Sequence, residues 1–490
     1  MDKTKLILLV LIIFLTSCAV GPDYHRPLAL TSPAYKEAKG KSFKQSKVKW
    51  KVAEPAHCHS GQWWQVFNDG VLNDLENKLN ANNQSVINAY YNYKQACALV
   101  DEARAAFFPT LTAALTLTRQ KSGSTSSFIS TSTSGQTSTG IAGTGGSGSS
   151  TITSSHSWLM AASWEPDIWG LVRRTVEASV AGAEASAALL ASTRLSMQAT
   201  LAQTYFELRG LDALQKLLND TVRDDAAALK LTKNRYAAGV AGRPDVVQAQ
   251  SVLEAAQAQA INNGILRGQY EHAIAVLIGL PPASLTIEAA RTPFIPPEIP
   301  LGVPSELLER RPDIAQAERL MAQANAQIGV AVAAYYPTVN LTGTLSTGTR
   351  SLGQLFDVPS LSWSLGSQIA ETIIDGGLRA ATIRAAGATY QATVANYRQV
   401  VLAAFQNVED NLISLRILDK QIMVERKAVA SAKLALKLVL NQYKSGTVDY
   451  SSVITAQINA YTIQQNEIEA EYQRMVSAVG LIKGLGGYWE

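Results

Sequence analysis

The same order of motifs occurs twice along the chain, and this duplication limits the fold more than any other feature. Phe107-Phe108-Pro109-Thr110-Leu111 returns as Tyr335-Tyr336-Pro337-Thr338-Val339, and Leu229-Lys230-Leu231 returns as Leu436-Lys437-Leu438. A repeated order of this kind indicates two copies of one structural unit. The fold must therefore consist of two similar halves, each with the same succession of elements.

Each copy contains a hairpin of the kind found in membrane β-barrels. Apolar and small polar residues alternate strictly over 110–118 and over 338–346. This period of two, with one apolar and one small polar face, is typical of a membrane β-strand. A second alternating run follows in each copy, so we expect β-hairpins over 109–166 and 337–371. The first hairpin carries a loop over 122–155 that is mostly Ser, Thr and Gly. On the strands alone, the alternative is a soluble sandwich hairpin with one wet face.

Long segments without proline predict helical hairpins. No proline lies between Pro166 and Pro244, nor after Pro359, and these stretches are rich in good helix formers such as Ala, Leu, Glu, Arg and Gln. A helix over 171–236 would be about 100 Å long, which is wider than a compact domain. Gly239 and Gly446 are placed to end the outgoing helices. The expected ranges are a first long helical hairpin over 167–280, and a second one with the C-terminus over 372–490. We also expect an N-terminal segment with a first helical region over 18–108, a proline-rich linker over 281–304 and a first helix of the second repeat over 305–336.

Three glycines lie inside the predicted long helices, at Gly182, Gly210 and Gly387. Glycine costs stability in a helix interior relative to alanine. We therefore expect that these positions allow close helix approach or local bending.

The N-terminus has the pattern of an export signal followed by a lipid anchor. Lys3 and Lys5 precede an apolar run over 6–14, which is too short to span a bilayer but has the length of a signal-peptide core. Leu15-Thr16-Ser17-Cys18 resembles a bacterial lipobox, in which Cys18 is acylated and the signal peptide 1–17 is removed. Ala19, rather than Asp, follows the cysteine, which indicates transfer to the outer membrane. The alternative is an ordinary leader with an incidental cysteine.

Membrane insertion would require several copies of the chain. After Phe14 no apolar stretch reaches the ~20 residues that a membrane helix needs, so any further crossing must use β-strands. Four strands cannot close a barrel, because about eight are the practical minimum. Two copies would supply eight strands and three would supply twelve. Only the larger ring leaves a water-filled lumen.

Composition argues against nucleic acid, metal and thiol chemistry. The chain has 43 basic and 39 acidic residues, a net charge of +4 that gives no reason to expect a nucleic-acid partner. Its five histidines and three cysteines are scattered, so we expect no metal site and no cofactor. In an extended segment, His57-Cys58-His59 would point to opposite sides and would not converge on one ion. An oxidising periplasm would allow a disulfide between Cys58 and Cys97, and the sequence does not decide whether it forms.

Carboxylates at the expected strand ends give no enzyme signature. Glu165, Asp167 and Asp375 lie where strands are followed by helices. No companion base, nucleophile or pocket motif accompanies them. We expect them to cap helices or to face a lumen, and we expect no enzymatic activity.

Motifs across the mature chain carry a family resemblance. They are Cys18-Ala19-Val20-Gly21-Pro22-Asp23-Tyr24, Gly61-Gln62-Trp63-Trp64 with Phe67, the run 309–318 that begins Glu309-Arg310-Arg311-Pro312-Asp313, the run 326–330, and Asp375-Gly376-Gly377. Together they resemble the TolC-like outer-membrane efflux factors, in particular the NodT-type lipoprotein branch of resistance-nodulation-division systems. The resemblance implies a homotrimer with four transmembrane strands per subunit in a twelve-stranded β-barrel, and a periplasmic α-barrel of long helical hairpins. It also implies a periplasmic adaptor and an inner-membrane resistance-nodulation-division pump as partners.

The same resemblance assigns roles to the two hairpin tips. In the family the tips form the periplasmic mouth, which rests closed and opens on docking with the adaptor. The alternative is that they are plain glycine-capped turns. Many relatives close the pore with a Leu and an Asp after the second tip, where this chain has Ser451 and Thr455. Asp245, Asp449 or Tyr450 are the candidates to form the gate instead. The matching tip residues are Tyr236, Gly239, Val240, Tyr443, Gly446, Thr447 and Val448.

These features favour a passive export channel for small molecules, anchored through acylated Cys18 in the outer membrane. Two alternatives remain at this point. One is a structural lipoprotein that spans the envelope without conducting. The other is an exit duct for a secreted protein.

Overall fold

The computed structural model of the chain describes residues 19–28, 35–37, 61–122, 151–290, 294–297, 299, 310–355, 357 and 360–487. The chain forms two compact units, each described by itself. The sheet unit contains Asp101–Glu177 and Ala326–Ala386 with the chain up to Pro22. The helical unit contains Asp23–Val100, Ala178–Asn325 and Gly387–Glu490.

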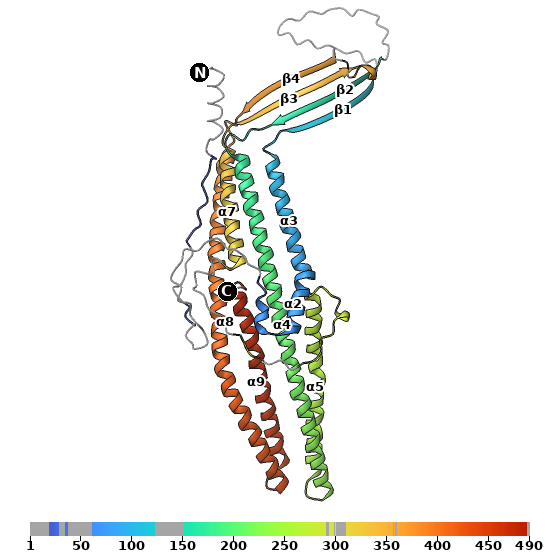
Figure 1. The fold of residues 1–490 in the computed structure, drawn as a ribbon, viewed down its shortest axis with the longest axis vertical. Coiled ribbons are helices and arrows are strands. Elements are labelled where there is room, and N and C mark those ends of the chain that lie inside the picture. The colour runs from blue at the N-terminus through green and yellow to red at the C-terminus, as the bar shows by residue number, and fades with distance from the viewer. Residues whose placement is uncertain are drawn as a thin grey trace, which may run out of the picture. The chain divides into compact units, whose positions relative to one another are not determined.

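The sheet unit is built on one antiparallel sheet to which each repeat contributes a hairpin (Figure 1). Its strand order follows the chain, β1-β2-β3-β4. A short 3-10 helix, η4 (Leu352–Gln354), lies between β3 and β4. The strands are β1 (Thr110–Ser122), β2 (Thr151–Trp164), β3 (Thr338–Thr349) and β4 (Leu361–Ala370).

The register of the sheet places the apolar positions of all four strands on one face. Directly opposite residues share a face in a sheet. Ala113 lies opposite Met160, Met160 opposite Leu345, and Leu345 opposite Trp363. The neighbouring row alternates with it and is small and polar, running through Thr112, Ala161, Thr344 and Ser364. The two faces predicted for each single strand are therefore continuous across the sheet.

The loop predicted over 122–155 is too long at its far end. β2 begins at Thr151, and Ser154 and Ser155 pair with Arg119 and Thr118. Serine and threonine composition predicts a loop, but a long β1 offers backbone partners over its whole length. Backbone pairing therefore sets the start of β2, because the backbone hydrogen bonds between strands form whatever the side chain is.

Two long helical hairpins follow the two strand hairpins, as expected (Figure 1). The first consists of α4 (Leu171–Ala237) and α5 (Arg243–Leu277), and the second of α8 (Leu378–Ser445) and α9 (Tyr450–Gly484). Gly239 (φ +73°) and Gly446 (φ +78°) end the outgoing helices in the left-handed conformation that glycine adopts without strain.

Shorter helices precede each strand hairpin. A break at Asn83 separates α2 (Gly70–Asn82) from α3 (Gln84–Ala105). The Asp69 side chain accepts hydrogen bonds from the first turn of α2, which is ordinary N-capping. In the second repeat α7 (Pro312–Ala333) starts at a proline, and two 3-10 helices, η1 (Trp63–Phe67) and η2 (Pro282–Ser284), complete the described elements used below. Among the described residues, no helix has both the length and the apolar character needed to cross a membrane.

Buried charges join the first hairpin to the segment that follows it. Arg209 donates to Asp212 at 2.9 Å, and Arg267 donates to the other oxygen of the same carboxylate at 2.8 Å. Arg209 also donates to the carbonyl of Glu288. Paired and hydrogen-bonded charges avoid the large cost of burying an isolated ion. The described part of the inter-repeat linker is thereby fixed to α4 and α5.

The run Arg310-Arg311-Pro312-Asp313 connects two helix ends. Arg311 donates to both oxygens of Asp313, at 3.0 and 2.6 Å, and to the carbonyl of Gly484 at 2.9 Å. The start of α7 is thus bound to the last turn of α9, where carbonyl groups lack helical partners.

Two of the three interior glycines lie where another side chain approaches the helix closely. A Cβ atom at Gly210 would lie 2.5 Å from Cδ1 of Tyr472 on α9, whereas at Gly182 it would meet the flexible end of Gln323. At Gly387 a Cβ would meet no atom within 4 Å in the described part of the protomer. Close packing is therefore found at two of the three positions.

Gly210→Ala is expected to lower the free energy of unfolding by about 1–3 kcal/mol, because the added methyl group overpacks the Tyr472 ring. Gly387→Ala is the matched control and is expected to raise it by up to ~1 kcal/mol, the helix-propensity gain alone. Denaturant unfolding of the purified protein, followed by far-ultraviolet circular dichroism, measures both. A stabilising effect of Gly210→Ala would contradict the packing reported for α4 and α9.

Candidate functional site

The two hairpin tips differ although they derive from the same repeat. In the first tip Tyr236 and Val240 are exposed, at 49% and 64%. In the second tip Tyr443, the repeat equivalent of Tyr236, is buried and packs on Tyr450 with ring centroids 5.3 Å apart. The first tip therefore offers a free aromatic surface, and the second uses its aromatic residues as a local core.

Arg235 joins the two tips within one protomer. Its Nη1 donates to the carbonyls of Tyr443 at 2.7 Å and Lys444 at 2.8 Å. Its guanidinium also lies 4.6 Å from the centre of the Tyr443 ring. These carbonyls belong to the last turn of α8, which carries partial negative charge. No pattern in the sequence singles out Arg235, although it directly precedes Tyr236.

A buried carboxylate lies between α4 and α9 near the tips. Asp225 is 3% exposed and accepts a hydrogen bond of 3.0 Å from Nε2 of Gln457. Within the described part of the chain, the Oε1 atom of Gln457 is buried and has no hydrogen-bond partner. Burial, and then repulsion by Asp224, raises the pKa of Asp225 to about 6. Sequence spacing gives no sign of this pair, because its members lie on different repeats.

The proposed gate residues are not equivalent in the structure. Tyr450 is 1% exposed and belongs to the hydrophobic cluster at the tips, so within the protomer its ring has no free surface with which to line a pore. Asp449, Ser451 and Thr455 are exposed, and Asp245 is partly exposed in the first turn of α5. Gly446 and Thr447 are exposed and Val448 is partly buried.

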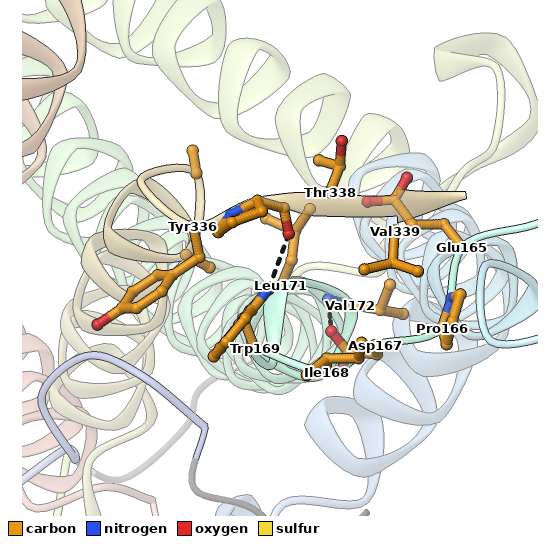
Figure 2. A pocket seen from close by; sticks show the side chains of 13 residues that line it. Glu165, Pro166, Asp167, Ile168, Trp169, Leu171, Val172, Tyr336, Thr338 and Val339 are labelled. Atoms are coloured by element: carbon orange, nitrogen blue, oxygen red, sulfur yellow. Dashed lines mark hydrogen bonds between the residues drawn. The ribbon is translucent and has the colours of Figure 1, made fainter. Parts of the chain in front are cut away.

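In the sheet unit, a short connection joins β2 to α4 and is fixed by Asp167 and Trp169 (Figure 2). Asp167 accepts hydrogen bonds from the backbone of Val172 at 3.0 Å and Arg173 at 2.9 Å. Trp169 stacks on Tyr336 and donates to the carbonyl of Pro337 at 2.8 Å. The enclosed pocket of about 40 Å³ has room for little more than a water molecule. The contacts of Asp167 and Trp169 therefore fix the start of α4 relative to the end of β2.

Asp375 performs the corresponding task after β4. It accepts hydrogen bonds from the backbone of Gly377 and from Nε of Arg379, at 2.9 and 2.7 Å. The bond from Arg379 is the main reason that the pKa of Asp375 falls to about 2. The carboxylate is therefore ionised and engaged as a cap.

The segment 19–28 contacts distant parts of the chain within each unit. In the sheet unit, a Cβ at Gly21 would be 2.5 Å from Cα of Gly329, so the first and fourth resemblance motifs are in contact. In the helical unit, Tyr24 donates to Glu318 at 2.8 Å and Arg26 donates to the Tyr397 hydroxyl. These contacts join distant parts of the chain and had no signal in spacing or composition.

Several earlier expectations fall outside the described residues. Cys18, the expected lipidation site, is among them, as are His57-Cys58-His59. The pairing of Cys58 with Cys97 therefore stays open. Within the described ranges, no group of three or more His, Cys, Asp or Glu side chains is arranged to hold a metal ion.

Comparison with known proteins gives consistent matches over nearly the whole chain. The sequence profile of the family described as Outer membrane efflux protein matches residues 75–280 and 303–487. The toluene efflux pump outer membrane protein TtgC of Pseudomonas putida is 29% identical over 491 residues, covering 100% of this chain and 96% of that protein. The pyoverdine export outer membrane protein OpmQ of Pseudomonas aeruginosa is 31% identical over 436 residues, 88% of each chain.

Solved structures give the same result. The outer-membrane channel OprN superposes with a TM-score of 0.82 at 26% identity, covering 96% of this chain and 100% of that one. The open state of the Neisseria gonorrhoeae MtrE outer membrane channel superposes with a TM-score of 0.76 at 26% identity, covering 96% and 98%.

Asp225→Asn is expected to stabilise the protein most above pH 6. The raised native pKa means that the folded state binds the extra proton between about pH 4 and 6, so the parent loses stability as pH rises through this window. The variant lacks this loss, and its new amide can donate to Gln457. Melting temperatures measured from pH 4 to 8 are expected to diverge through the window and then stay a constant distance apart. Asp224→Asn, at an exposed neighbour, is the control with a smaller effect. A difference without a pH trend would contradict the assignment.

Proposed function

Because the chain belongs to the outer membrane efflux protein family and is an outer-membrane channel component of an efflux pump, we propose that three copies assemble into one export duct. The matched relatives are channels and export components rather than enzymes. Energy for export comes from an inner-membrane pump joined to the duct by a periplasmic adaptor.

The observation that carries this proposal is the open sheet of the single protomer. In the described structure β1 and β4 each pair on one side only. A free strand edge in lipid leaves backbone groups unsatisfied at several kcal/mol each. Three sheets of four strands, joined β1 to β4, close a twelve-stranded barrel without edges.

The two faces of the sheet fit the two environments of such a barrel. Leu111, Leu115 and Leu117 are 57–65% exposed in the protomer, and Trp363 and Leu365 are exposed further along the same face. We assign this apolar face to lipid. The row of Thr112, Ala161, Thr344 and Ser364 then lines a lumen with small polar groups, which suits passage of dissolved molecules.

The helical unit also has two open sides. In it α4 contacts α5 through Asn263 and Leu211, and α9 contacts α8 through Arg426 and Glu471. Exposed apolar residues lie along α5 and α8, and in an isolated protomer these residues would face water. We propose that α5 of one copy packs against α8 of the next. The residues are Ile261, Ile265 and Val276 on α5, and Ile417, Val424, Leu434 and Leu438 on α8.

The tips form the periplasmic mouth in this proposal. Tyr236 and Val240, with exposed Gly239, Gly446 and Thr447, present the surface for the adaptor. Tyr443 and Val448 support this surface as part of the hydrophobic cluster at the tips. Asp245 and Asp449 remain candidates for a carboxylate gate, with Ser451 and Thr455 on the adjoining turn of α9. Bonds from Arg235 to the second tip favour the resting arrangement.

The transported class is small molecules. The names of the matched relatives refer to toluene and pyoverdine. No charged or aromatic ligand pocket is needed by a passive duct, and the small polar sheet face is compatible with varied cargo.

Purified acylated protein is expected to give discrete conductance steps in planar lipid bilayers. Deletion of the gene is expected to make cells more sensitive to exported compounds. Asp245→Ala and Asp449→Ala are expected to change the resting conductance, whereas Arg223→Gln, at an exposed site on α4, is the control. Unchanged conductance would remove the two aspartates as gates. Silent bilayers together with unaltered drug sensitivity would favour a non-conducting spacer.

Cys18→Ser is expected to abolish fatty-acid attachment, because the diacylglyceryl group is carried on the cysteine sulfur. Metabolic labelling with radioactive palmitate, followed by purification, measures this. Cys97→Ser is the matched control and should keep the label. Label retained in Cys18→Ser would exclude this residue as the anchor.

A further inference from the structure

One strand of the sheet carries basic residues, and both of them lie near its far end. They are Arg119 and Lys121 of β1, whereas the sequences of β2, β3 and β4 contain no lysine, arginine, aspartate or glutamate. Both side chains are exposed. Basic residues destabilise a membrane strand at the middle of the lipid layer and are tolerated near its boundaries. The position of this pair on the sheet therefore decides what it can bind.

Arg119 and Lys121 lie on the apolar face. Side chains alternate between the two faces of a strand, so the row that contains Leu115 and Leu117 continues through the two basic residues. Ile152 lies opposite Lys121 and is 52% exposed. In the proposed barrel, on which this inference rests, this face contacts lipid.

The height of the two cations along β1 matches the edge of the apolar layer. A strand rises about 3.4 Å per residue, so Lys121 lies about 34 Å along the strand from Leu111. At a strand tilt of about 40° this is about 26 Å along the barrel axis, and the apolar band of membrane barrels is about 25 Å tall. Arg119 lies two residues earlier, and its long side chain can extend towards the same boundary. Both cations therefore reach the headgroup layer.

The connectivity of the chain assigns this boundary to the outer leaflet. β1 begins at Thr110, shortly after α3, and β2 ends at Trp164, shortly before α4. Arg119 and Lys121 lie at the other end of β1, beside the start of β2. Because the helices occupy the periplasm in the proposed duct, the basic end of β1 faces the outside of the cell.

Few acidic residues are available to neutralise this end of the sheet. The sequence 123–150, which connects β1 to β2, contains no charged residue. The connection between β3 and β4 contributes Arg350 and one carboxylate, Asp357. Within the described part of the chain, no carboxylate lies within ion-pair distance of Arg119 or Lys121. Three cations and one anion leave a net charge of +2 at this end of each copy.

The residues that directly follow the strands at the opposite end are acidic. Glu165 follows β2 and Glu371 follows β4, and both are exposed. At the basic end, Trp363 is 72% exposed on the apolar face, and aromatic side chains are typical of the membrane boundary in β-barrels. The ends of the strands thus differ in charge, as a sheet between an anionic outer leaflet and the periplasm requires.

We propose that Arg119 and Lys121 form a binding surface for the phosphate groups of anionic glycolipids in the outer leaflet. Guanidinium and ammonium groups bind phosphate oxygens through charge-assisted hydrogen bonds. The acyl chains of the same lipid pack on Leu115 and Leu117. A trimer has three such surfaces around the barrel, and they fix its height in the membrane.

The test uses the full-length acylated protein in detergent, titrated with lipid A, a phosphorylated glycolipid, and followed by native mass spectrometry. The parent is expected to bind lipid A about tenfold or more tightly than the same lipid without its phosphates. Arg119→Gln and Lys121→Gln are each expected to weaken binding by about fivefold, and together by about twentyfold. Inorganic phosphate at the same concentration is expected not to displace the lipid, because it has no acyl chains.

A matched control keeps the net charge and changes only the face. When Arg119→Gln is combined with Gln120→Arg, the guanidinium moves to the small polar face. This variant is expected to bind lipid A as weakly as Arg119→Gln alone. Arg223→Gln, at an exposed site on α4, is expected to bind as the parent does.

Equal binding of lipid A with and without phosphates, unweakened binding by the double variant, full binding by the face-exchanged variant, or displacement by inorganic phosphate would overturn the proposal. Conductance of the parent in planar bilayers separates this failure from failure of the duct. A conducting trimer without a preference for phosphate overturns the lipid surface alone, whereas a parent that neither assembles nor conducts overturns both. If the double variant fails to assemble, the two single variants decide.

Discussion

Backbone hydrogen bonding at the edges of a four-stranded sheet is the constraint on which the rest of this structure depends. Water can satisfy a free edge, but lipid cannot, so a sheet of this size inserts only when its edges are shared with other copies. The register supports this, because it makes one continuous apolar face and one small polar face across β1 to β4. The long helical hairpins follow from the same requirement, since each strand hairpin is continued by a pair of helices that must find neighbours of their own.

Charge pairing gives the helical unit its specificity. The Arg209–Asp212–Arg267 network fixes the described linker to the first hairpin, and Arg311 with Asp313 fixes the start of α7 to the end of α9. Buried ion pairs add little net stability but are costly to break singly. Their effect here is to select one arrangement of helices that are otherwise uniform in Ala, Leu and Gln.

The two repeats have diverged where they would meet a partner. At the first tip Tyr236 is exposed, whereas its equivalent Tyr443 is buried against Tyr450 and held by Arg235. The duplication thus gave two similar helical hairpins. Differences between the repeats then left one tip with an exposed aromatic side chain and the other with a buried one.

The sequence by itself determined the repeat, the four strands with their apolar faces, the turns at Gly239 and Gly446, and the extents of the long helices to within a few residues. These are local properties, because periodicity, proline positions and glycine caps act within a few turns of the chain. Tertiary structure alone decided that β2 starts at Thr151, that Tyr450 is buried, that Arg235 bonds to the second tip, and that Asp225 pairs with Gln457. Each of these depends on residues from distant segments, whose spacing in the sequence carries no record of their distance in space.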